Sequence, residues 1–205
     1  MSTQMPPQLF PQSNGNRSWS LVYGKQDYDY MSQRPGKSGE LMLGGGFSRS
    51  LGKGLDQLAA YDDSITDPLT ECHLNGMITT IFGENGRNGS VKNIWSGIIC
   101  YTPDSLPYVG KLNHRLTGRK VGTVDGEVKD EPAEWISAGY HGEGMVYGWL
   151  CGVAIARMVV GSQDEDLEER PGMPGGRVVD WFPRELLVSN KRVQDGDILD
   201  IANER

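Results

Sequence analysis

The residues best suited to chemistry lie in one glycine loop, within the stretch WISAGYHGEGMVYGWLCGVAIARMVVG, residues 135–161. Gly139, Gly142 and Gly144 separate a short apolar run from a longer one, a pattern that predicts a strand, a tight turn and a helix start. Glycine allows a left-handed backbone and close approach, and the first turn of a helix presents unpaired N–H groups with a partial positive charge. The loop is therefore a candidate site for an anionic or electron-rich ligand atom. The alternative is a helix packed closely in a core without any ligand.

A second pattern lies in the predicted helix itself. Small residues recur every four positions at Gly148, Gly152 and Ala156, so that they share one face of the helix. Small side chains let a helix approach its neighbour closely. We therefore expect this face to lie tightly against a sheet.

Other candidate motifs lack the spacing that their chemistry requires. Gly36-Lys37-Ser38 resembles the end of a phosphate-binding loop, but the first glycine of that motif would fall at Met31. The triplet Gly44–Gly46 is not GxGxxG, because position 49 is Arg49. The histidines and cysteines are scattered without the spacing of metal ligands, so we expect no metal site. The sequence also has no GxSxG motif, which disfavours a serine hydrolase.

Composition narrows the possible functions further. The formal charge of −7 argues against nucleic-acid binding, which needs clustered basic residues. The three cysteines are odd in number and far apart in sequence, so we expect a reducing, intracellular and most simply cytoplasmic location. The apolar segment 145–160 is shorter than the ~20 residues that a bilayer span needs and contains Arg157, so we expect no membrane partner.

The N-terminal half of the sequence predicts an antiparallel sheet with a helix. Residues 1–18 are rich in Pro, Gln, Ser and Asn, which predicts a disordered N-terminus. From Trp19, short apolar runs separated by turn-forming residues predict two or three antiparallel strands. A helix-compatible segment follows from about Gln57 to Phe82, which predicts one or two helices beside the sheet.

The residues that precede the glycine loop predict a second set of strands. Trp95–Tyr101 is apolar enough for a buried strand, Thr102–Pro107 predicts a turn, and Tyr108–Leu112 predicts another short strand. After Gly161, an acidic run and a short amphipathic piece make residues 162–205 a predicted linker and docking tail.

Three blocks in this order resemble the FAD-dependent oxidoreductases of the D-amino-acid oxidase, glycine oxidase and sarcosine oxidase type, especially their fungal relatives. The blocks are DYMSQRPGKSGELMLGGG, WSGIICYTPDSLPYVG and the glycine-loop stretch, and the resemblance covers residues 19–161. It implies an α+β fold, with an antiparallel substrate-domain sheet in residues 19–90 and the C-terminal portion of a Rossmann-like FAD-binding fold in residues 91–161. It also implies oxidation of an amine or amino-acid C–N bond by hydride transfer to the flavin, often with oxygen as the final acceptor.

The same resemblance implies a set of site residues. His141 would be a candidate general base, although an oxidase of this type can oxidise a neutral amine without one. Arg34 would be a candidate partner for a substrate carboxylate, with a surface arginine as the alternative. The positions implied as flavin contacts are Gly139, Tyr140, Gly142, Glu143, Gly144 and Met145.

The sequence departs from this family at one large point. It has no N-terminal βαβ unit with a GxGxxG fingerprint, which also disfavours an NAD-dependent dehydrogenase. The position of a covalent flavin cysteine in some relatives is Gly97 here, so Cys100 is not assigned that role. The sequence thus resembles the C-terminal part of such an enzyme, and the alternative is a non-catalytic product or subunit that needs a partner supplying the N-terminal half. In either case, we expect apolar surface without a partner.

Overall fold

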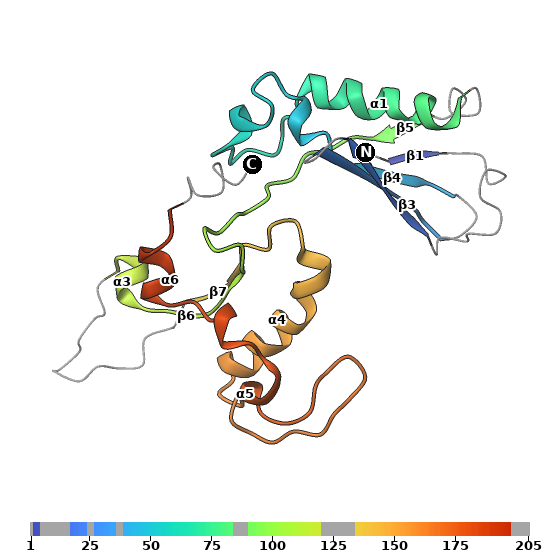
Figure 1. Ribbon diagram of the computed structural model, residues 1–205. Helices are drawn as coiled ribbons and strands as arrows, with labels where there is room; N and C mark the ends of the chain where they lie inside the picture. The colour runs from blue at the N-terminus through green and yellow to red at the C-terminus, as the bar shows by residue number, and fades with distance from the viewer. Residues whose placement is uncertain are drawn as a thin grey trace. The chain divides into compact units, whose positions relative to one another are not determined.

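The computed structural model describes residues 2–4, 17–23, 27–35, 39–83, 90–119 and 134–197. The chain forms two compact units, Met1–Ile98 and Ile99–Arg205, and each has its own hydrophobic core (Figure 1). Helices and short antiparallel sheets occur in both units, which agrees with a mixed α and β protein. Among the helices of these described ranges, none has the length and apolar character that a bilayer span requires.

Unit 1 is built on a five-stranded sheet in which all neighbouring strands are antiparallel. Across the sheet the strands follow the order β2 (Ser18–Tyr23), β3 (Asp27–Gln33), β4 (Leu41–Gly44), β1 (Ser2–Gln4) and β5 (Ser90–Asn93). The antiparallel strands predicted after Trp19 are confirmed as β2, β3 and β4. Ser2–Gln4 differs from the predicted disordered N-terminus, because β1 pairs with both β4 and β5. Residues 5–16 lie outside the described residues.

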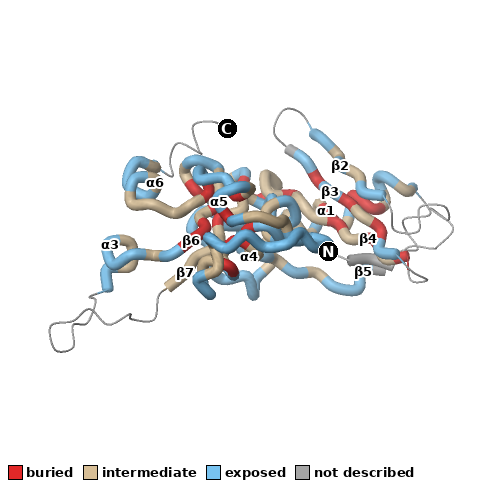
Figure 2. The backbone as a smooth tube through the Cα atoms, turned by 90° about the horizontal axis from the view of Figure 1, so that it is seen from below, coloured by how far each residue is buried: buried red, intermediate tan, exposed pale blue. Residues whose placement is uncertain are grey.

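The core of unit 1 lies between this sheet and one helix, α1 (Pro68–Phe82). Burial alternates along β4, so that Leu41 and Leu43 point to the same face of the sheet. They pack with Met31 of β3, and α1 contributes Leu74, Met77 and Ile78. Figure 2 marks buried positions on β3, β4 and α1 of this unit.

The helix α1 begins where its sequence provides two start signals. The side chain of Asp67 accepts a hydrogen bond from the backbone N–H of Thr70 at 2.7 Å, and Pro68 occupies the first turn. The predicted helix within 57–82 is therefore confirmed from Pro68 onward. Two short 3₁₀ turns, η2 (Phe47–Arg49) and η3 (Leu55–Gln57), connect β4 to α1.

The predicted buried strand at Trp95–Tyr101 is wrong. Residues 94–100 lie outside any strand, and no strand of the described residues pairs with them. The side chain of Trp95 is 51% exposed, and Ile98 and Ile99 are exposed as well. An apolar run becomes a buried strand only where another strand and a covering layer are present, and the part of the chain that the structure describes supplies no such strand. The boundary between the units also falls after Ile98 rather than at residue 90, because β5 pairs with β1 of unit 1.

Unit 2 contains a two-stranded antiparallel sheet, a long helix and the C-terminal segment. Strands β6 (Tyr108–Leu112) and β7 (Glu134–Ala138) pair along their whole length, and α4 (Gly144–Val159) follows β7. The strand predicted at Tyr108–Leu112 is therefore confirmed as β6. The remaining helices are α3 (His114–Thr117), α5 (Val178–Trp181), η4 (Arg184–Leu186) and α6 (Asn190–Gln194).

The C-terminal segment supplies half of the unit 2 core. Val178, Phe182 and Leu186 are buried in one cluster with residues of β6 and α4, namely Val109, Cys151 and Ala154. The backbone N–H of Val188 donates to the carbonyl of Val109 at 2.9 Å, which places residues 187–188 beside β6. The part of the expected docking tail that the structure describes thus contributes Val178, Phe182 and Leu186 to the core of this unit.

Candidate functional site

The glycine loop has the predicted order of strand, turn and helix. Strand β7 ends at Ala138 and α4 begins at Gly144. Between them the backbone is left-handed at Gly139 (φ 80°), His141 (φ 52°) and Gly142 (φ 85°). Glycine takes this conformation without strain, whereas a histidine does so less often. The tight turn between β7 and α4 therefore depends on the two glycines, and His141 must be held by other contacts.

The two ends of the loop face different surroundings. A Cβ atom at Gly139 would lie 2.5 Å from Cγ2 of Thr102, so the close approach at this glycine is to the chain itself. A Cβ atom at Gly142 or Gly144 would meet nothing within 4 Å. The loop is thus anchored at its start and open at its end, where α4 begins.

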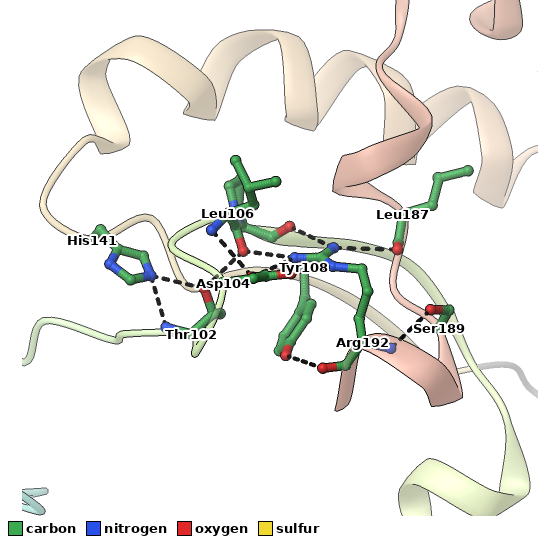
Figure 3. Close-up of polar contacts among 9 residues, drawn as sticks. Thr102, Asp104, Leu106, Tyr108, His141, Leu187, Ser189 and Arg192 are labelled. Carbon is green, nitrogen blue, oxygen red and sulfur yellow. Dashed lines mark hydrogen bonds and ion pairs between the residues drawn. The ribbon is translucent and has the colours of Figure 1, made fainter. Parts of the chain in front are cut away.

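The anchor of the loop is a pair of contacts between His141 and Thr102 (Figure 3). The backbone N–H of Thr102 donates to Nε2 of His141 at 2.8 Å, and the Thr102 hydroxyl oxygen lies 2.7 Å from the same nitrogen. In addition, the backbone N–H of His141 donates to the carbonyl of Cys100 at 3.2 Å. Because Nε2 accepts the N–H of Thr102, the neutral ring carries its proton on Nδ1.

Burial governs the protonation of this histidine. Burial lowers the pKa of His141 below its ordinary value, and the nearby carboxylate of Asp104 opposes the shift only in part. If Nε2 carried a proton, it could no longer accept the hydrogen bond from the N–H of Thr102, and the two N–H groups would point toward each other. The ring is therefore neutral near pH 7 and works as a fixed acceptor that holds the loop.

The start of α4 has the free donors that an anionic ligand requires. The N-cap residue Glu143 makes no side-chain cap, and the N–H groups of Val146 and Tyr147 both bond back to its carbonyl at 2.9 and 3.1 Å. Among the described residues, no acceptor meets the N–H of Gly144 or of Met145. The side chain of Met145 is 99% exposed, so the helix start faces open space. Four of the six implied flavin positions, from Gly142 to Met145, surround these donors.

Tyr140 differs from these positions. It packs against the core of unit 2, and its hydroxyl lies 2.5 Å from the hydroxyl of Ser137 in β7. Gly139 is buried against Thr102. These two residues therefore support the loop through contacts with the rest of unit 2.

Arg34 lies in unit 1 and has a partner there. Its guanidinium binds the carboxylate of Glu40 at 2.9 Å, and its backbone N–H donates to the Glu40 carbonyl at 2.8 Å. The side chain is 62% exposed. These contacts favour a role for Arg34 as an ordinary surface arginine over a role in binding a substrate carboxylate.

The small residues of α4 do not face a sheet, so that prediction is wrong. A Cβ atom at Gly148 or Gly152 would meet nothing within 4 Å, and Ala156 is exposed. The helix packs instead through another face, which includes Cys151 and Ala154. We call the exposed side the open face of α4, defined by Met145, Val146, Gly148, Gly152, Ala156 and Val159. Trp149 lies at its edge, where the indole N–H donates to the carbonyl of Gly172.

The contact that holds the turn before β6 was missed from the sequence. Arg192 of α6 binds Asp104 through Nε and a terminal nitrogen, at 2.7 and 2.9 Å (Figure 3). This pair holds the pKa of the Asp104 carboxyl below its usual range. The two residues are 88 positions apart, so no local pattern could have joined them.

Unit 1 contains a separate buried polar pair. Asp29 is 1% exposed, and its carboxylate contacts Nε2 of His73 at 2.6 Å and accepts the backbone N–H of Gly46 at 2.7 Å. The pair ties the glycine turn after β4 to α1, which is a structural role. No group of three His, Cys, Asp or Glu side chains in the part of the chain that the structure describes could hold a metal ion.

Comparisons with known proteins give no match for this chain. Neither family models nor curated proteins nor solved structures resemble it at a significant level.

Proposed function

We propose that this chain provides one side of a flavin site in a FAD-dependent oxidoreductase that oxidises an amine or amino-acid C–N bond. The observation that carries the proposal is the exposed start of α4, where the N–H groups of Gly144 and Met145 meet no acceptor among the described residues. The open space at Gly142 and Gly144 fits the approach of a flat ring edge. We propose FAD as the ligand because the loop sequence resembles that of the D-amino-acid oxidase type.

The residues of this chain would act mainly through position and charge. Bound FAD would accept the hydride from the substrate and leave negative charge on the pyrimidine side of its ring. The free N–H groups at the start of α4 would donate to that side, and the helix dipole would favour the added charge. His141 would hold the loop through Thr102. In this proposal it does not act as a base through Nε2, because that atom already accepts a hydrogen bond.

Two further features of the proposal concern the surroundings of the reaction. The three cysteines are free thiols, which fits a reducing compartment such as the cytoplasm. Molecular oxygen is the electron acceptor that we propose for the reduced flavin. The substrate class is a small amine or amino acid, and Arg34 is not part of the proposed substrate site.

The second candidate is a non-catalytic chain that needs a partner supplying the N-terminal FAD-binding half. Two observations favour it: the open face of α4, and the unpaired apolar segment 94–100. A chain that carried a complete dinucleotide site would be expected to cover such surfaces. The two candidates differ in whether the 205-residue chain holds flavin by itself.

The test is the visible absorption spectrum of the purified chain after incubation with excess FAD and removal of free cofactor. Retained flavin bands that disappear in Gly144→Asp would support the proposed site, because a carboxylate there would repel the anionic ring edge and bind the free N–H groups. Gly76→Asp is the matched control, since it adds the same charge at another open glycine. A colourless wild-type protein would favour the second candidate.

A further inference from the structure

One arginine connects the C-terminal helix α6 to the turn before β6. Beyond the pair with Asp104, the Arg192 guanidinium donates to three backbone carbonyls: those of Leu106 at 2.9 Å, and of Pro107 and Leu187 at 3.2 Å. Its charged carbon lies 4.5 Å from the ring centre of Tyr108. Because both carboxylate oxygens of Asp104 are held, the 102–107 turn is fixed in orientation as well as in place.

The same turn holds the glycine loop from its other side. Thr102 is buried, its hydroxyl contacts the carbonyl of Leu106 at 2.8 Å, and its N–H and hydroxyl meet Nε2 of His141. Its methyl group lies against Gly139. A continuous series of contacts therefore runs from Arg192 through the turn to His141, which immediately precedes the open end of the loop (Figure 3).

Little else attaches α6 to unit 2. None of its residues is buried, and Val193 is exposed. The other contacts are single hydrogen bonds, such as the one from Asn113 Nδ2 to Asn190 Oδ1 at 3.2 Å. A change at Arg192 would thus remove the charged link between the turn and α6 while leaving the apolar core of Val178, Phe182 and Leu186 in place. The hydrogen bond from the Tyr108 hydroxyl to the backbone carbonyl of residue 192 would remain.

We infer that Arg192 is a positioning residue for the glycine loop, and that the C-terminal segment is part of the ligand site at the start of α4. Donors that meet a developing charge must be held within ~0.5 Å of their working positions, and residues behind the site supply that restraint. The role of Arg192 at the loop stands on the contacts above. Its importance for flavin rests on the proposed function.

The test compares backbone amide exchange in Arg192→Gln with that in the wild-type chain. Two amides of the loop are followed. The N–H of His141 donates to the carbonyl of Cys100, and the N–H of Glu143 donates to the carbonyl of Tyr140. We expect their protection to fall by about tenfold or more, as hydrogen bonds to a charged group are lost, while amides in α1 keep theirs. Arg177→Gln is the matched control, because Arg177 is exposed and its side chain pairs with Asp180 at the start of α5, away from the 102–107 turn in sequence. Unchanged protection at His141 and Glu143 in Arg192→Gln would overturn the inference.

A second variant keeps the inference testable if Arg192→Gln does not fold. Thr102→Val preserves the shape of the side chain but removes the hydroxyl that contacts His141 and Leu106. It should reduce protection at the same two amides without releasing α6. Equal protection in Thr102→Val and wild type would count against the inference, because the link from Leu106 to His141 through the Thr102 hydroxyl would then carry no restraint.

The flavin measurement separates this inference from the proposed function. Lower protection in Arg192→Gln together with weaker retention of FAD would support both. Lower protection in a protein that retains no FAD even as wild type would support the positioning role and count against flavin as the ligand of the isolated chain.

Discussion

Thr102 and His141 meet at two points, since the backbone N–H and the hydroxyl oxygen of Thr102 both lie within 2.8 Å of Nε2 of the histidine. Thr102 is buried, so its N–H has no access to water if the histidine is lost. The contact joins a turn before β6 to the loop after β7, and it fixes the histidine in a left-handed backbone conformation.

The first prediction concerns His141→Asn. Asparagine tolerates a left-handed backbone, so the change removes the contact with Thr102 and the ring contact with Tyr101 without straining the backbone. We expect unit 2 to lose about 1–3 kcal/mol of unfolding free energy, because a buried N–H is left unpaired. Denaturant titration followed at amides of β6 and α4 would measure the loss. His114→Asn is the control at an exposed histidine in α3, and an equal effect of both changes would contradict the prediction.

The second prediction is a dependence of stability on pH. The pKa of His141 in the folded chain lies below the ordinary value of 6.5, so the unfolded chain binds the proton more readily. The contribution of His141 should be complete above pH 6.5 and lost as the pH falls through the folded pKa. His141→Asn should flatten this part of the profile. NMR titration of the ring checks the premise, and a midpoint at or above 6.5 would refute it.

The third prediction is that alanine has opposite effects on stability at two glycines of unit 2. Gly139→Ala should destabilise the unit by about 2–4 kcal/mol, because it forces a left-handed alanine against the side chain of Thr102. Gly152→Ala should stabilise the isolated chain by about 1 kcal/mol, because the helix gains propensity and nothing obstructs the methyl group. Thermal unfolding would show shifts of opposite sign. A loss of stability in Gly152→Ala would mean that this side of α4 is covered.

The fourth prediction concerns the open face of α4. We expect the isolated chain to bind a dye for apolar surface and to associate, because Val146, Trp149 and Val159 are exposed. Val146→Glu and Val159→Lys together should reduce both effects, since each charge also suits its end of the helix dipole. Leu69→Glu in α1 is a control at an exposed leucine of unit 1. If dye binding falls equally in the control, the open face is not its source.

Local patterns in the sequence predicted the elements around the site. An apolar run, a set of glycines and a longer apolar run placed β7, the loop and α4. Antiparallel strands after Trp19 were also recognisable, since short apolar runs separated by turn residues have few other structures available.

Contacts across long sequence separations could not be predicted in the same way. Small residues at Gly148 and Gly152 permit close packing but do not say whether a neighbour is present. The apolar run at Trp95 is exposed for the same reason, because burial depends on what the rest of the chain supplies. The contacts of Thr102 with His141, 39 residues away, and of Asp104 with Arg192, 88 residues away, depend on the tertiary fold.

The position of β1 between β4 and β5 has a consequence for how unit 1 folds. The hairpins of β2, β3 and β4 join residues close in sequence and can form early. Strand β1 pairs Ser2 with Met42 of β4, which closes a loop of about forty residues. It also pairs Thr3 with Val91 of β5, which closes a loop of nearly ninety residues. During synthesis, β4 would keep a bare edge until β1 arrives, and β1 would have its second partner only after Asn93 leaves the ribosome. We therefore expect the pairing of β1 with β5, which closes the longest loop of this sheet, to form last.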